Sequence, residues 1–323
     1  MTHKVFVDGQ EGTTGLQINQ YLMARADIDL LRIDAAKRKD AAERARLLNA
    51  ADVAFLCLPD AAAREAVALV TNPKTCVIDA SSAHRTAPGW IYGLPELVAD
   101  QREAIRRAIR IANPGCHATG FILLVRPLVE AGLLPADYPL AATSITGYSG
   151  GGRKMIEQYQ AGGDPKLESP RQYGFGLAHK HLPEMQTHGR LAAPPVFLPI
   201  VADFFKGLAV SIGLQTRSLP AGASPERLHE ALSRHYDGER FVKVRPLNDP
   251  EVTDGGYFDV QACNDTNRAD LFVFGHAGQV MLVCRIDNLG KGASGAAVQS
   301  MNLRLGVDEA AGLESAVPLQ AAA

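Results

Sequence analysis

Short apolar runs alternate with longer helix-like runs through the first third of the chain. The expected strands cover residues 4–8, 30–33, 53–58, 76–79 and 109–112, and the expected helices cover residues 13–25, 35–49 and 61–70. Alternation of this kind is typical of βαβ units, in which helices cover both faces of a parallel sheet. The pattern therefore predicts an α/β chain that begins with a doubly wound domain.

The pattern changes after Asn113, where glycine and proline become more frequent. Strand-like runs recur at residues 208–214, 241–244, 257–263, 271–274 and 280–286. We expect one clear helix at 225–235 with Ser224 as its N-cap, and a last amphipathic helix at about 293–305. A chain of 323 residues exceeds what one hydrophobic core usually serves. We therefore expect a second, α+β domain, built on a mixed sheet with helices on one face.

Charge and cysteine content narrow the class of protein. The net charge of −2 provides no excess of positive charge that would attract nucleic acid or an acidic membrane surface. The N-terminus lacks the pattern of a signal peptide, and no apolar run reaches the roughly 18 residues of a membrane-spanning helix. Five cysteines without regular spacing do not make a disulfide framework. We expect a cytoplasmic enzyme or binding protein for small molecules, with no nucleic-acid or membrane partner.

Three glycines at a spacing of three residues follow the first expected strand. They are Gly9, Gly12 and Gly15, in the sequence GQEGTTG. Glycine in such a turn permits a tight bend, approach of a pyrophosphate to the backbone, and close packing of helix on strand. The following helix directs free N–H groups and a partial positive charge at the phosphates. Glycines also end strands for structural reasons alone, but this position favours a dinucleotide site.

The residues after the second expected strand leave the choice between NAD and NADP open. Asp34 stands where a carboxylate would hold the ribose 2′-OH of NAD. Lys37, Arg38 and Lys39 follow directly, and cations there would suit the 2′-phosphate of NADP. The structural alternative is that all four side chains lie exposed to water on a loop and bind no cofactor. Spacing alone does not decide between these interpretations.

Cys116 differs in its surroundings from the other cysteines. Cys57, Cys76, Cys263 and Cys284 lie in apolar strand-like runs, and we interpret them as small buried hydrophobic residues. Cys116 lies in NPGCHATG, between a short strand and an apolar helix. The turn places its sulfur at a helix N-terminus, where the helix dipole and free N–H groups favour thiolate over thiol. The alternative is a cysteine that only caps the turn; we favour a nucleophile.

A thiolate nucleophile needs a partner for proton transfer. His179 and His181 lie two residues apart in HKHLPE, where we expect an extended segment that projects both rings to the same side. Glu184 would orient one of the two rings. The alternative is that these three residues bind a metal, since His-x-His is a familiar ligand pair. No further ligand cluster stands out, so we expect no metal.

Two other segments are rich in hydrogen-bond donors. Residues 81–85 (SSAHR), which include Ser81 and Arg85, follow the fourth strand, at the edge where open α/β sheets bind ligands. Residues 148–154 (YSGGGRK) join a glycine-rich turn to two cations, one of them Arg153. Such a combination suits a phosphate or carboxylate. Each segment has the plainer alternative of a solvated loop.

Taken in order, these motifs resemble one enzyme family. They are GQEGTTGL, SSAHR, YGLPEL, NPGCHATG, GYSGGGRK, HKHLPEM and DNLGKGASGAAVQSMNLRLG. Over nearly the whole chain they are similar to the shorter form of the N-acetyl-gamma-glutamyl-phosphate reductases of arginine biosynthesis, within the semialdehyde dehydrogenase superfamily. NPGC alone is less specific, because related semialdehyde dehydrogenases carry a similar cysteine turn.

The resemblance implies reduction of an acyl phosphate, N-acetyl-gamma-glutamyl phosphate, by NADPH to the semialdehyde with release of phosphate. It implies a Rossmann-like NADP-binding domain at residues 1–115 plus about 288–323, and a catalytic and oligomerisation domain at 116–287. Cys116 would displace phosphate and form a thioester, and His179 or His181 would be the acid/base. The assembly would be a homodimer or homotetramer.

The resemblance also assigns ligand-binding positions. At the cofactor it places Gly9, Gly12, Thr13, Thr14, Gly15, Ser81, Asn288, Lys291, Gly292, Ala293 and Gly295. At the substrate it places Arg85, Asn113, Ser149 and Arg153. Asp34 departs from this assignment, because its charge would repel a 2′-phosphate.

Three rival functions are compatible with parts of the sequence. Aspartate-semialdehyde dehydrogenase or an aminoadipyl-phosphate reductase would use the same chemistry on another substrate. A nucleotide-sensing regulator would keep the fold without the activity, and the intact Cys116 argues against it. A zinc hydrolase would be built on His179 and His181.

Overall fold

The computed structural model describes residues 2–10 and 12–313, and the chain divides into two compact units. Unit 1 comprises Met1–Gly115 and Ala293–Ala323, and unit 2 comprises Cys116–Gly292. Residues 314–323 of the predicted first domain lie outside the described residues. Within the described part, no helix combines the length and apolar character needed to span a membrane.

The return of the chain to unit 1 occurs at Ala293, later than the predicted boundary near residue 288. Asn288 explains the difference. Its Oδ1 accepts a hydrogen bond from the backbone N–H of Gly207 at 2.8 Å, and its Nδ2 donates to Ser149 Oγ at 3.0 Å. Both partners belong to unit 2, so residues 288–292 are part of that unit.

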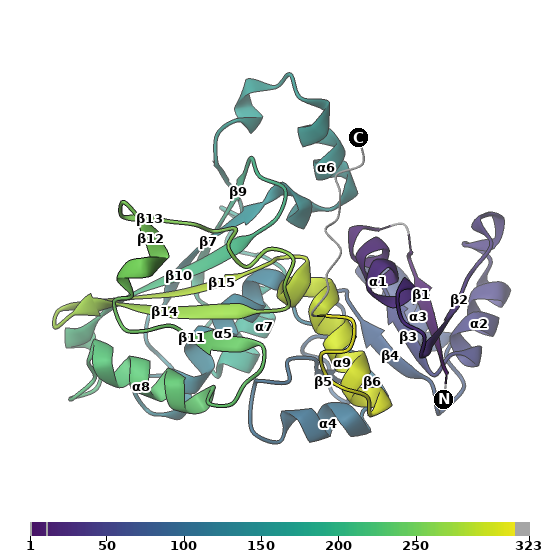
Figure 1. Ribbon diagram of the computed structural model, residues 1–323, viewed down its shortest axis with the longest axis horizontal. Helices are drawn as coiled ribbons and strands as arrows, with labels where there is room; N and C mark the ends of the chain where they lie inside the picture. Colours follow the sequence, from purple (N-terminus) through teal and green to yellow (C-terminus); the bar gives the residue numbers. More distant parts are fainter. Residues whose placement is uncertain (1, 11, 314–323) are drawn as a thin grey trace. The chain divides into compact units, whose positions relative to one another are not determined.

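Unit 1 is built on a six-stranded sheet in which every pair of neighbouring strands is parallel, in the order β2-β1-β3-β4-β6-β5 (Figure 1). The strands are β1 (His3–Asp8), β2 (Ile28–Leu31), β3 (Val53–Leu56), β4 (Cys76–Asp79), β5 (Ile91–Tyr92) and β6 (Arg110–Ala112). This parallel sheet confirms the predicted doubly wound, Rossmann-like fold, in which the helices that join the strands cover both faces of the sheet.

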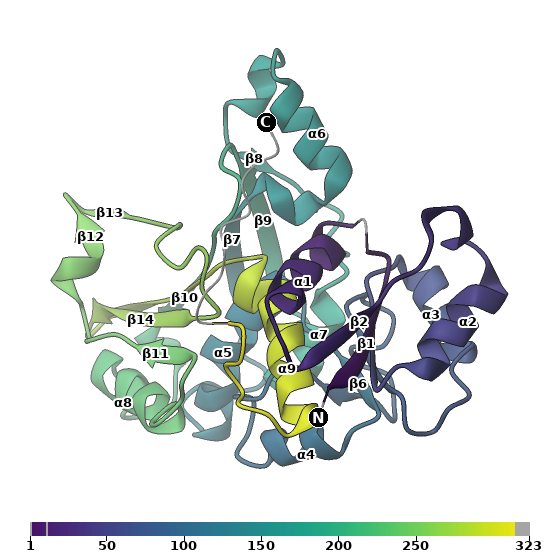
Figure 2. The same ribbon diagram turned by 45° about the vertical axis from the view of Figure 1, so that its right-hand side comes forward.

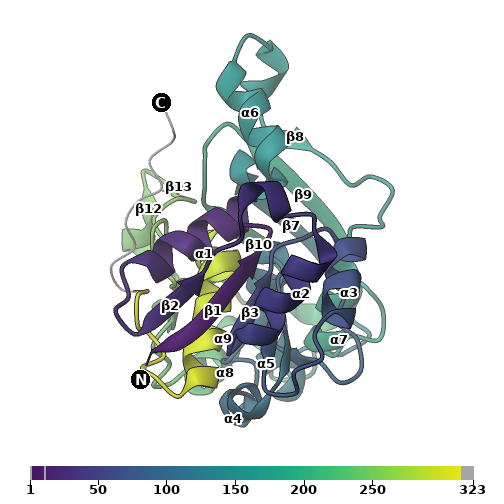
Figure 3. The same cartoon turned by 90° about the vertical axis from the view of Figure 1, so that its right-hand side faces the viewer.

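Helices pack on both faces of this sheet. They are α1 (Thr13–Met23), α2 (Ala41–Ala50), α3 (Asp60–Ala68), α4 (Gln101–Arg107) and α9 (Gly295–Leu305). Leu48 of α2 and Ala66 of α3 share one apolar cluster with Phe6 of β1. On the other face α9 contacts α1, α4 and β4. Figure 3 shows α9 between α1 and α4.

The predicted helix at 35–49 starts later than expected. Residues Ala35–Lys37 form a single 3-10 turn, and α2 begins at Ala41. Asp40 causes the break, because its carboxylate accepts hydrogen bonds from the backbone N–H groups of Ala42 and Glu43 and so caps the helix.

Unit 2 is built on a seven-stranded mixed sheet in the order β11-β14-β15-β10-β7-β9-β8. Its strands are β7 (Ala141–Gly147), β8 (Arg171–Gln172), β9 (Val196–Ala202), β10 (Leu208–Gln215), β11 (Val242–Val244), β14 (Ala269–His276) and β15 (Gln279–Ile286). Its helices are α5 (Cys116–Glu130), α6 (Arg153–Ala161), α7 (Leu182–Gly189) and α8 (Pro225–His235).

One face of this sheet carries α5 and α8, as Figure 2 shows. Gly120 lets α5 approach β10 closely, because a Cβ there would lie 2.9 Å from Val210 Cγ2. The expected mixed sheet with helices on one face is confirmed, and the side chain of Ser224 caps α8 as predicted. Helix α6 was not predicted from its polar, glycine-rich surroundings.

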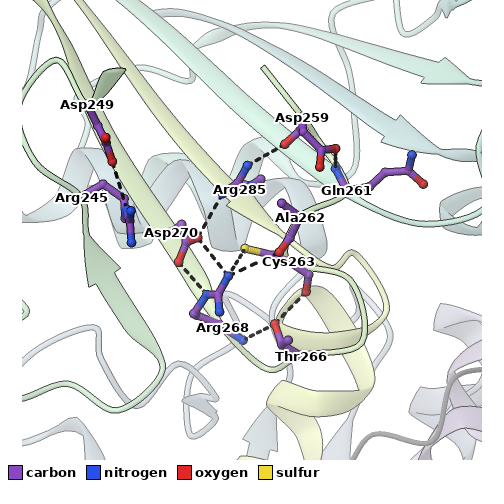
Figure 4. A network of polar contacts seen from close by, with 10 residues as sticks. All are labelled: Arg245, Asp249, Asp259, Gln261, Ala262, Cys263, Thr266, Arg268, Asp270 and Arg285. Carbon is purple, nitrogen blue, oxygen red and sulfur yellow. Dashed lines mark hydrogen bonds and ion pairs between the residues drawn. The ribbon is translucent and has the colours of Figure 1, made fainter. Parts of the chain in front are cut away.

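The predicted strand at 257–263 is wrong beyond its first two residues. Only Tyr257–Phe258 (β13) is strand, paired with Thr253–Asp254 (β12). The rest of the segment is held by charged side chains of the sheet (Figure 4). Arg285 donates to the backbone oxygen of Asp259 at 2.7 Å, and Asp270 pairs with both Arg285 and Arg268.

Candidate active site

Cys116 is the first residue of α5, which begins two residues before the predicted start near Ala118, and its side chain is half-buried. The predicted position at a helix N-terminus is confirmed. Cys76, Cys263 and Cys284 are fully buried. Burial raises the pKa of Cys76 to about 12 and that of Cys263 to about 11, so both remain thiols near neutral pH. Cys57 is half-buried, contrary to the expectation of a buried residue, because it lies just past the end of β3.

The loop at residues 287–292 packs directly against the candidate nucleophile. A Cβ at Gly292 would lie 2.7 Å from Cys116 Cβ, so a larger residue would displace the cysteine. Asp287 holds the start of this loop, because its carboxylate accepts the backbone N–H groups of Asp265 and Leu289 at 2.8 Å each. Lys206 Nζ lies 3.8 Å from the same carboxylate. Burial raises the pKa of Asp287, and Lys206 and the N–H donors oppose that rise.

His179 and His181 lie side by side, with ring centroids 4.7 Å apart. The expected extended segment is wrong: His181 has helical dihedrals and precedes α7, with Pro183 in the first turn of that helix. The backbone N–H of His181 donates to His179 Nδ1 at 3.2 Å. His181 is buried, His179 is half-buried, and Glu184 is buried in the first turn of α7.

A third histidine joins this pair, and the sequence reasoning missed it. The ring centroid of His117 lies 5.6 Å from that of His179 and 5.5 Å from that of His181. Its position directly after Cys116 in NPGCH was the available signal. Because His117 is buried and near the positive groups of His179 and Lys180, its pKa is lowered to about 3, and the ring is neutral at physiological pH.

Tyr173 also contacts the His117 ring. Its Oη is 3.3 Å from His117 Nε2, and its ring centroid is 6.1 Å from that of His179. Burial, and then the negative charge of the Cys116 thiolate, raise the pKa of Tyr173, so its hydroxyl keeps its proton. Unit 2 thus gathers two further imidazoles and a phenol around His117, the residue that follows Cys116.

In unit 1 the glycine turn has the geometry that the sequence predicts. Gly9 has φ +88°, and a Cβ there would overlap the carbonyl oxygen of Cys57. A Cβ at Gly15 would overlap the carbonyl oxygen of Gly9. Gly12 is different, because its nearest neighbours would be 3.5 Å or more from a Cβ. The turn itself requires Gly9 and Gly15, and Gly12 leaves space at the N-terminus of α1.

The N-terminus of α1 begins at Thr13, and Gly12 provides no side chain to cap it. The free N–H groups of this first turn therefore suit a phosphate. Thr14 accepts a hydrogen bond at its backbone oxygen from Ser294 Oγ at 3.2 Å, and Gly295 is buried at the start of α9. The cofactor roles predicted for Thr13, Thr14 and Gly295 stay predictions.

Asp34 has a structural partner. Its Oδ1 accepts the backbone N–H of Ala36 at 2.8 Å and caps the 3-10 turn after β2. Lys37, Arg38 and Lys39 are exposed on and just after that turn. One carboxylate oxygen of Asp34 is thus turned to the backbone.

The donor-rich segment after β4 is anchored by a buried carboxylate. Asp79 accepts Ser81 Oγ at 2.7 Å and lies 2.6 Å from His84 Nδ1. Arg85 is buried, and its guanidinium donates to the backbone oxygen of Asn113 at 3.0 Å. Asn113 Nδ2 donates to the backbone oxygen of Ala293 at 2.9 Å. These contacts are structural, so the ligand roles predicted for Ser81, Arg85 and Asn113 stay predictions.

The remaining predicted residues lie in unit 2. Ser149 is buried and accepts the hydrogen bond from Asn288. Lys291 is fully buried with its Nζ 5.6 Å from the Phe241 ring centroid, a packing contact that was not expected of a cofactor-binding residue. Arg153, at the exposed start of α6, pairs with Glu157 at 3.2 Å. Within residues 2–10 and 12–313, no group of three or more His, Cys, Asp or Glu could hold a metal ion.

The glycine turn yields a first prediction. Gly9→Ala should lower the free energy of unfolding by more than about 1 kcal/mol, because its φ is left-handed and the methyl group meets a backbone oxygen. Gly12→Ala should fold normally and instead raise the KM for the dinucleotide. Urea unfolding and cofactor titration measure the two effects. Equal losses of stability in both variants would contradict this division of roles.

His117 yields a second prediction, about pH. Its pKa in the folded protein, about 3, lies below the ordinary value of 6.5, so its neutral form contributes stability above pH 6.5 that is lost as the pH falls toward 3. We expect the urea midpoint of the wild type to fall more steeply between pH 6.5 and 4 than that of His117→Gln. Parallel curves for the two proteins would show that His117 does not titrate in this way.

Comparison with known proteins agrees with this geometry. Residues 4–107 match the family described as "Semialdehyde dehydrogenase, NAD binding domain", and residues 116–288 match "Semialdehyde dehydrogenase, dimerisation domain". The chain is 49% identical to N-acetyl-gamma-glutamyl-phosphate reductase 2 of Nostoc sp., over 96% of this chain and 99% of the relative. It is 51% identical to N-acetyl-gamma-glutamyl-phosphate reductase 2 of Pseudomonas putida, with the same coverage.

Solved structures show the same fold at low sequence identity. Aspartate semialdehyde dehydrogenase II of Vibrio cholerae, complexed with ASA, superposes with a TM-score of 0.70 at 15% identity, covering 94% of this chain and 98% of that one. The Candida albicans aspartate semialdehyde dehydrogenase with NADP gives 0.64 at 14% identity, with the same coverage. These two likenesses show the fold alone, whereas the family matches and the 49–51% identities carry the assignment. The chain belongs to the semialdehyde dehydrogenase family, and within it to the N-acetyl-gamma-glutamyl-phosphate reductases.

Proposed function

We propose that this protein reduces N-acetyl-gamma-glutamyl phosphate to N-acetyl-glutamate semialdehyde with NADPH, releasing phosphate through a thioester on Cys116. The observation that carries the proposal is the half-buried Cys116 at the N-terminus of α5, followed along the helix by His117, whose ring clusters with those of His179 and His181. It occurs in a chain about half identical to reductases of that name. The reaction serves arginine biosynthesis.

The first half-reaction is acyl transfer from phosphate to sulfur. Cys116 Sγ attacks the carbonyl carbon, a C–S bond forms, and the bond between that carbon and the phosphate oxygen breaks. The thiol proton leaves through the acid/base and ends on the departing phosphate, so atoms and charges balance. The acyl phosphate already has a good leaving group, so orientation and stabilisation of the oxyanion contribute most to the rate.

His179 and His181 differ in what they offer as the acid/base. The Nδ1 of His179 accepts the backbone N–H of His181, so a neutral His179 carries its proton on Nε2. His179 is also the less buried of the two rings. We therefore assign proton transfer to His179 Nε2, with His181 fixing the tautomer through its backbone. Glu184 keeps its proposed role in orienting the pair.

The second half-reaction consumes the thioester. A thioester carbonyl accepts hydride more readily than a carboxylate does, and NADPH supplies the hydride when bound. Departure of the aldehyde returns the sulfur as a thiolate, which takes a proton from solvent. The glycine turn suits the pyrophosphate, because Gly12 has no Cβ and so leaves the N-terminus of α1 accessible to a phosphate. Arg153 is proposed to bind an anionic end of the substrate from the exposed start of α6.

We extend the proposal to assembly and location. A homodimer or homotetramer would form through unit 2, whose residues match a dimerisation domain. The sheet of that unit leaves Val196 and Met281 half-exposed, as expected for a surface that a second copy covers. The cytoplasm suits a reaction that depends on a reduced cysteine.

The nucleophile can be tested directly. Cys116→Ser should lower kcat by at least about a thousandfold, because a serine hydroxyl is scarcely ionised near neutral pH. Cys76→Ala, in a buried strand, should keep its turnover. The assay is phosphate-dependent reduction of NADP+ by N-acetyl-glutamate semialdehyde. Unchanged turnover in Cys116→Ser would refute the mechanism, and faster reaction with aspartate semialdehyde would refute the substrate.

Cofactor choice can be tested separately. Replacing Lys37, Arg38 and Lys39 together by alanine should raise the KM for NADPH at least about tenfold and leave that for NADH unchanged, because only the 2′-phosphate needs their charge. Lys74→Ala, an exposed lysine elsewhere in unit 1, serves as the control. Equal changes with both nucleotides would show that these cations do not recognise the 2′-phosphate.

A further inference from the structure

Arg171, at the start of β8, is a half-buried cation with which no carboxylate of the described residues forms an ion pair. Every other arginine of unit 2 either pairs with a carboxylate or is exposed to solvent. A charge that is partly removed from water is costly unless an opposite charge accompanies it. A half-buried guanidinium without a counter-ion in the protein therefore indicates an anionic ligand.

The guanidinium of Arg171 is held in place by Tyr159 of α6. Its Nη2 donates to Tyr159 Oη at 3.3 Å, and its Cζ lies 5.5 Å from the centroid of the Tyr159 ring. Tyr159 is buried and stacks on Tyr148, with ring centroids 4.6 Å apart. The Nε of Arg171 is buried and has no hydrogen-bond partner among the described residues. One hydrogen bond and one aromatic contact thus orient the cation, and donors of its planar fork remain for a ligand.

The strand pairing places Arg171 on the face of the sheet that carries His117. Arg171 lies opposite Val201 of β9, and the backbone N–H of Tyr173 donates to the backbone oxygen of Pro199 at 3.1 Å, so the same ladder continues to Tyr173. Side chains two residues apart on a strand point to the same face, at a spacing of roughly 7 Å. Tyr173 Oη is 3.3 Å from His117 Nε2. Arg171 is thus one row of the sheet away from a contact with the residue that follows the proposed nucleophile.

The row of the sheet that contains Arg171 leads to the loop beside Cys116. Arg171 of β8 and Thr146 of β7 lie in register with the same residue of β9, so their backbones are about 10 Å apart. A Cβ at Gly150 would lie 3.4 Å from Thr146 Oγ1 and 3.6 Å from Asn288 Nδ2. Asn288 belongs to the loop that packs against Cys116. The row therefore ends, two strands from Arg171, at the loop beside the proposed nucleophile.

We propose that Arg171 binds the α-carboxylate of the N-acetyl-glutamyl substrate and that Tyr159 is its positioning residue. In this substrate three carbon atoms separate the carboxylate from the acyl carbon that Cys116 attacks, whereas the phosphate is joined to that carbon through one oxygen. A cation one row away from the His117 contact suits the more distant of the two anionic groups, and Arg153 is left for the phosphate. The proposal rests on the proposed function for the identity of the substrate.

The alternative is that Arg171 only supports the stack of Tyr159 on Tyr148. A change at Arg171 would then lower the stability of the protein and weaken the binding of every substrate alike. Lysine at this position keeps the charge and most of the aliphatic packing but loses the planar fork. Glutamine loses the charge and keeps part of the packing. The two substitutions therefore separate charge and hydrogen bonding from packing.

The reverse reaction separates the two anionic groups, because N-acetyl-glutamate semialdehyde carries the carboxylate and inorganic phosphate is a substrate of its own. Arg171→Gln should raise the KM for the semialdehyde at least about tenfold and leave those for phosphate and NADP+ unchanged. Arg171→Lys should recover part of this loss. Arg217→Gln, at an exposed arginine of unit 2, is the matched control and should behave like the wild type.

Three kinetic results would overturn the proposal. A raised KM for phosphate alone would assign Arg171 to the phosphate. Equal rises for the semialdehyde and phosphate would indicate the packing role. Unchanged values for both would show that Arg171 holds neither group.

Binding without turnover provides a second test. N-acetylglutamine and its α-amide differ only in the carboxylate, and both carry a neutral amide where the substrate has its acyl phosphate. By calorimetry with NADP+ present, the wild type should bind the acid at least about tenfold more tightly than the amide, and Arg171→Gln should bind the two equally. Tyr159→Phe loses the hydrogen bond to Arg171 but keeps the ring, so it should reduce the preference only in part. The same preference in Arg171→Gln as in the wild type would overturn the proposal.

The two proposals can fail independently. A protein that prefers the acid through Arg171 but reduces no acyl phosphate would refute the function and support the carboxylate site. Loss of turnover in Cys116→Ser, with an unchanged KM for the semialdehyde in Arg171→Gln, would refute the site and support the function. Thermal unfolding of each variant, measured in parallel, identifies any that misfold, and Arg171→Lys is the variant chosen to retain the packing on Tyr159.

Discussion

The packing of the loop at residues 287–292 against the first turn of α5 is the constraint on which the site depends. Gly292 lies so close to Cys116 that a single added carbon would collide with it. Asp287 anchors the loop: its carboxylate is fully buried and accepts hydrogen bonds from the backbone N–H groups of Asp265 and Leu289. A charge in that position is tolerated only because Lys206 and the N–H donors offset the loss of hydration.

Electrostatics around the sulfur follow from the same burial. Three imidazoles with centroids about 5 to 6 Å apart could not all carry a positive charge in a shielded site. Burial keeps His117 neutral, and the phenol of Tyr173 keeps its proton. The result is a neutral, buried His117 directly after the half-buried Cys116. The other cysteines of unit 2, Cys263 and Cys284, are withdrawn into the core, where burial raises their pKa.

Unit 1 shows a similar division between turn geometry and ligand space. Gly9 and Gly15 are required because a Cβ on either would overlap a backbone oxygen, whereas a Cβ at Gly12 would make only ordinary contacts of 3.5 Å or more at the start of α1. The buried Asp79 organises Ser81 and His84 at the end of β4, and Arg85 ties that segment to Asn113. Ser81, Arg85 and Asn113, for which ligand roles are predicted, thus also have structural contacts.

The sequence by itself determined the parallel sheet of unit 1, the mixed sheet of unit 2, the helix that follows the turn at Pro114 and Gly115, and the cap at Ser224, because each depends on local periodicity or on a turn signal. It failed at residues 257–263, where Arg285 and Asp270 hold apolar chain out of the sheet, and at His179–His181, where Pro183 and α7 impose a turn. Only the tertiary structure decided that Ser144 and Tyr173 meet at His117, that Lys291 is buried against Phe241, and that Asp34 faces the backbone. Those outcomes depend on contacts between residues far apart in the chain, and no local pattern encodes them.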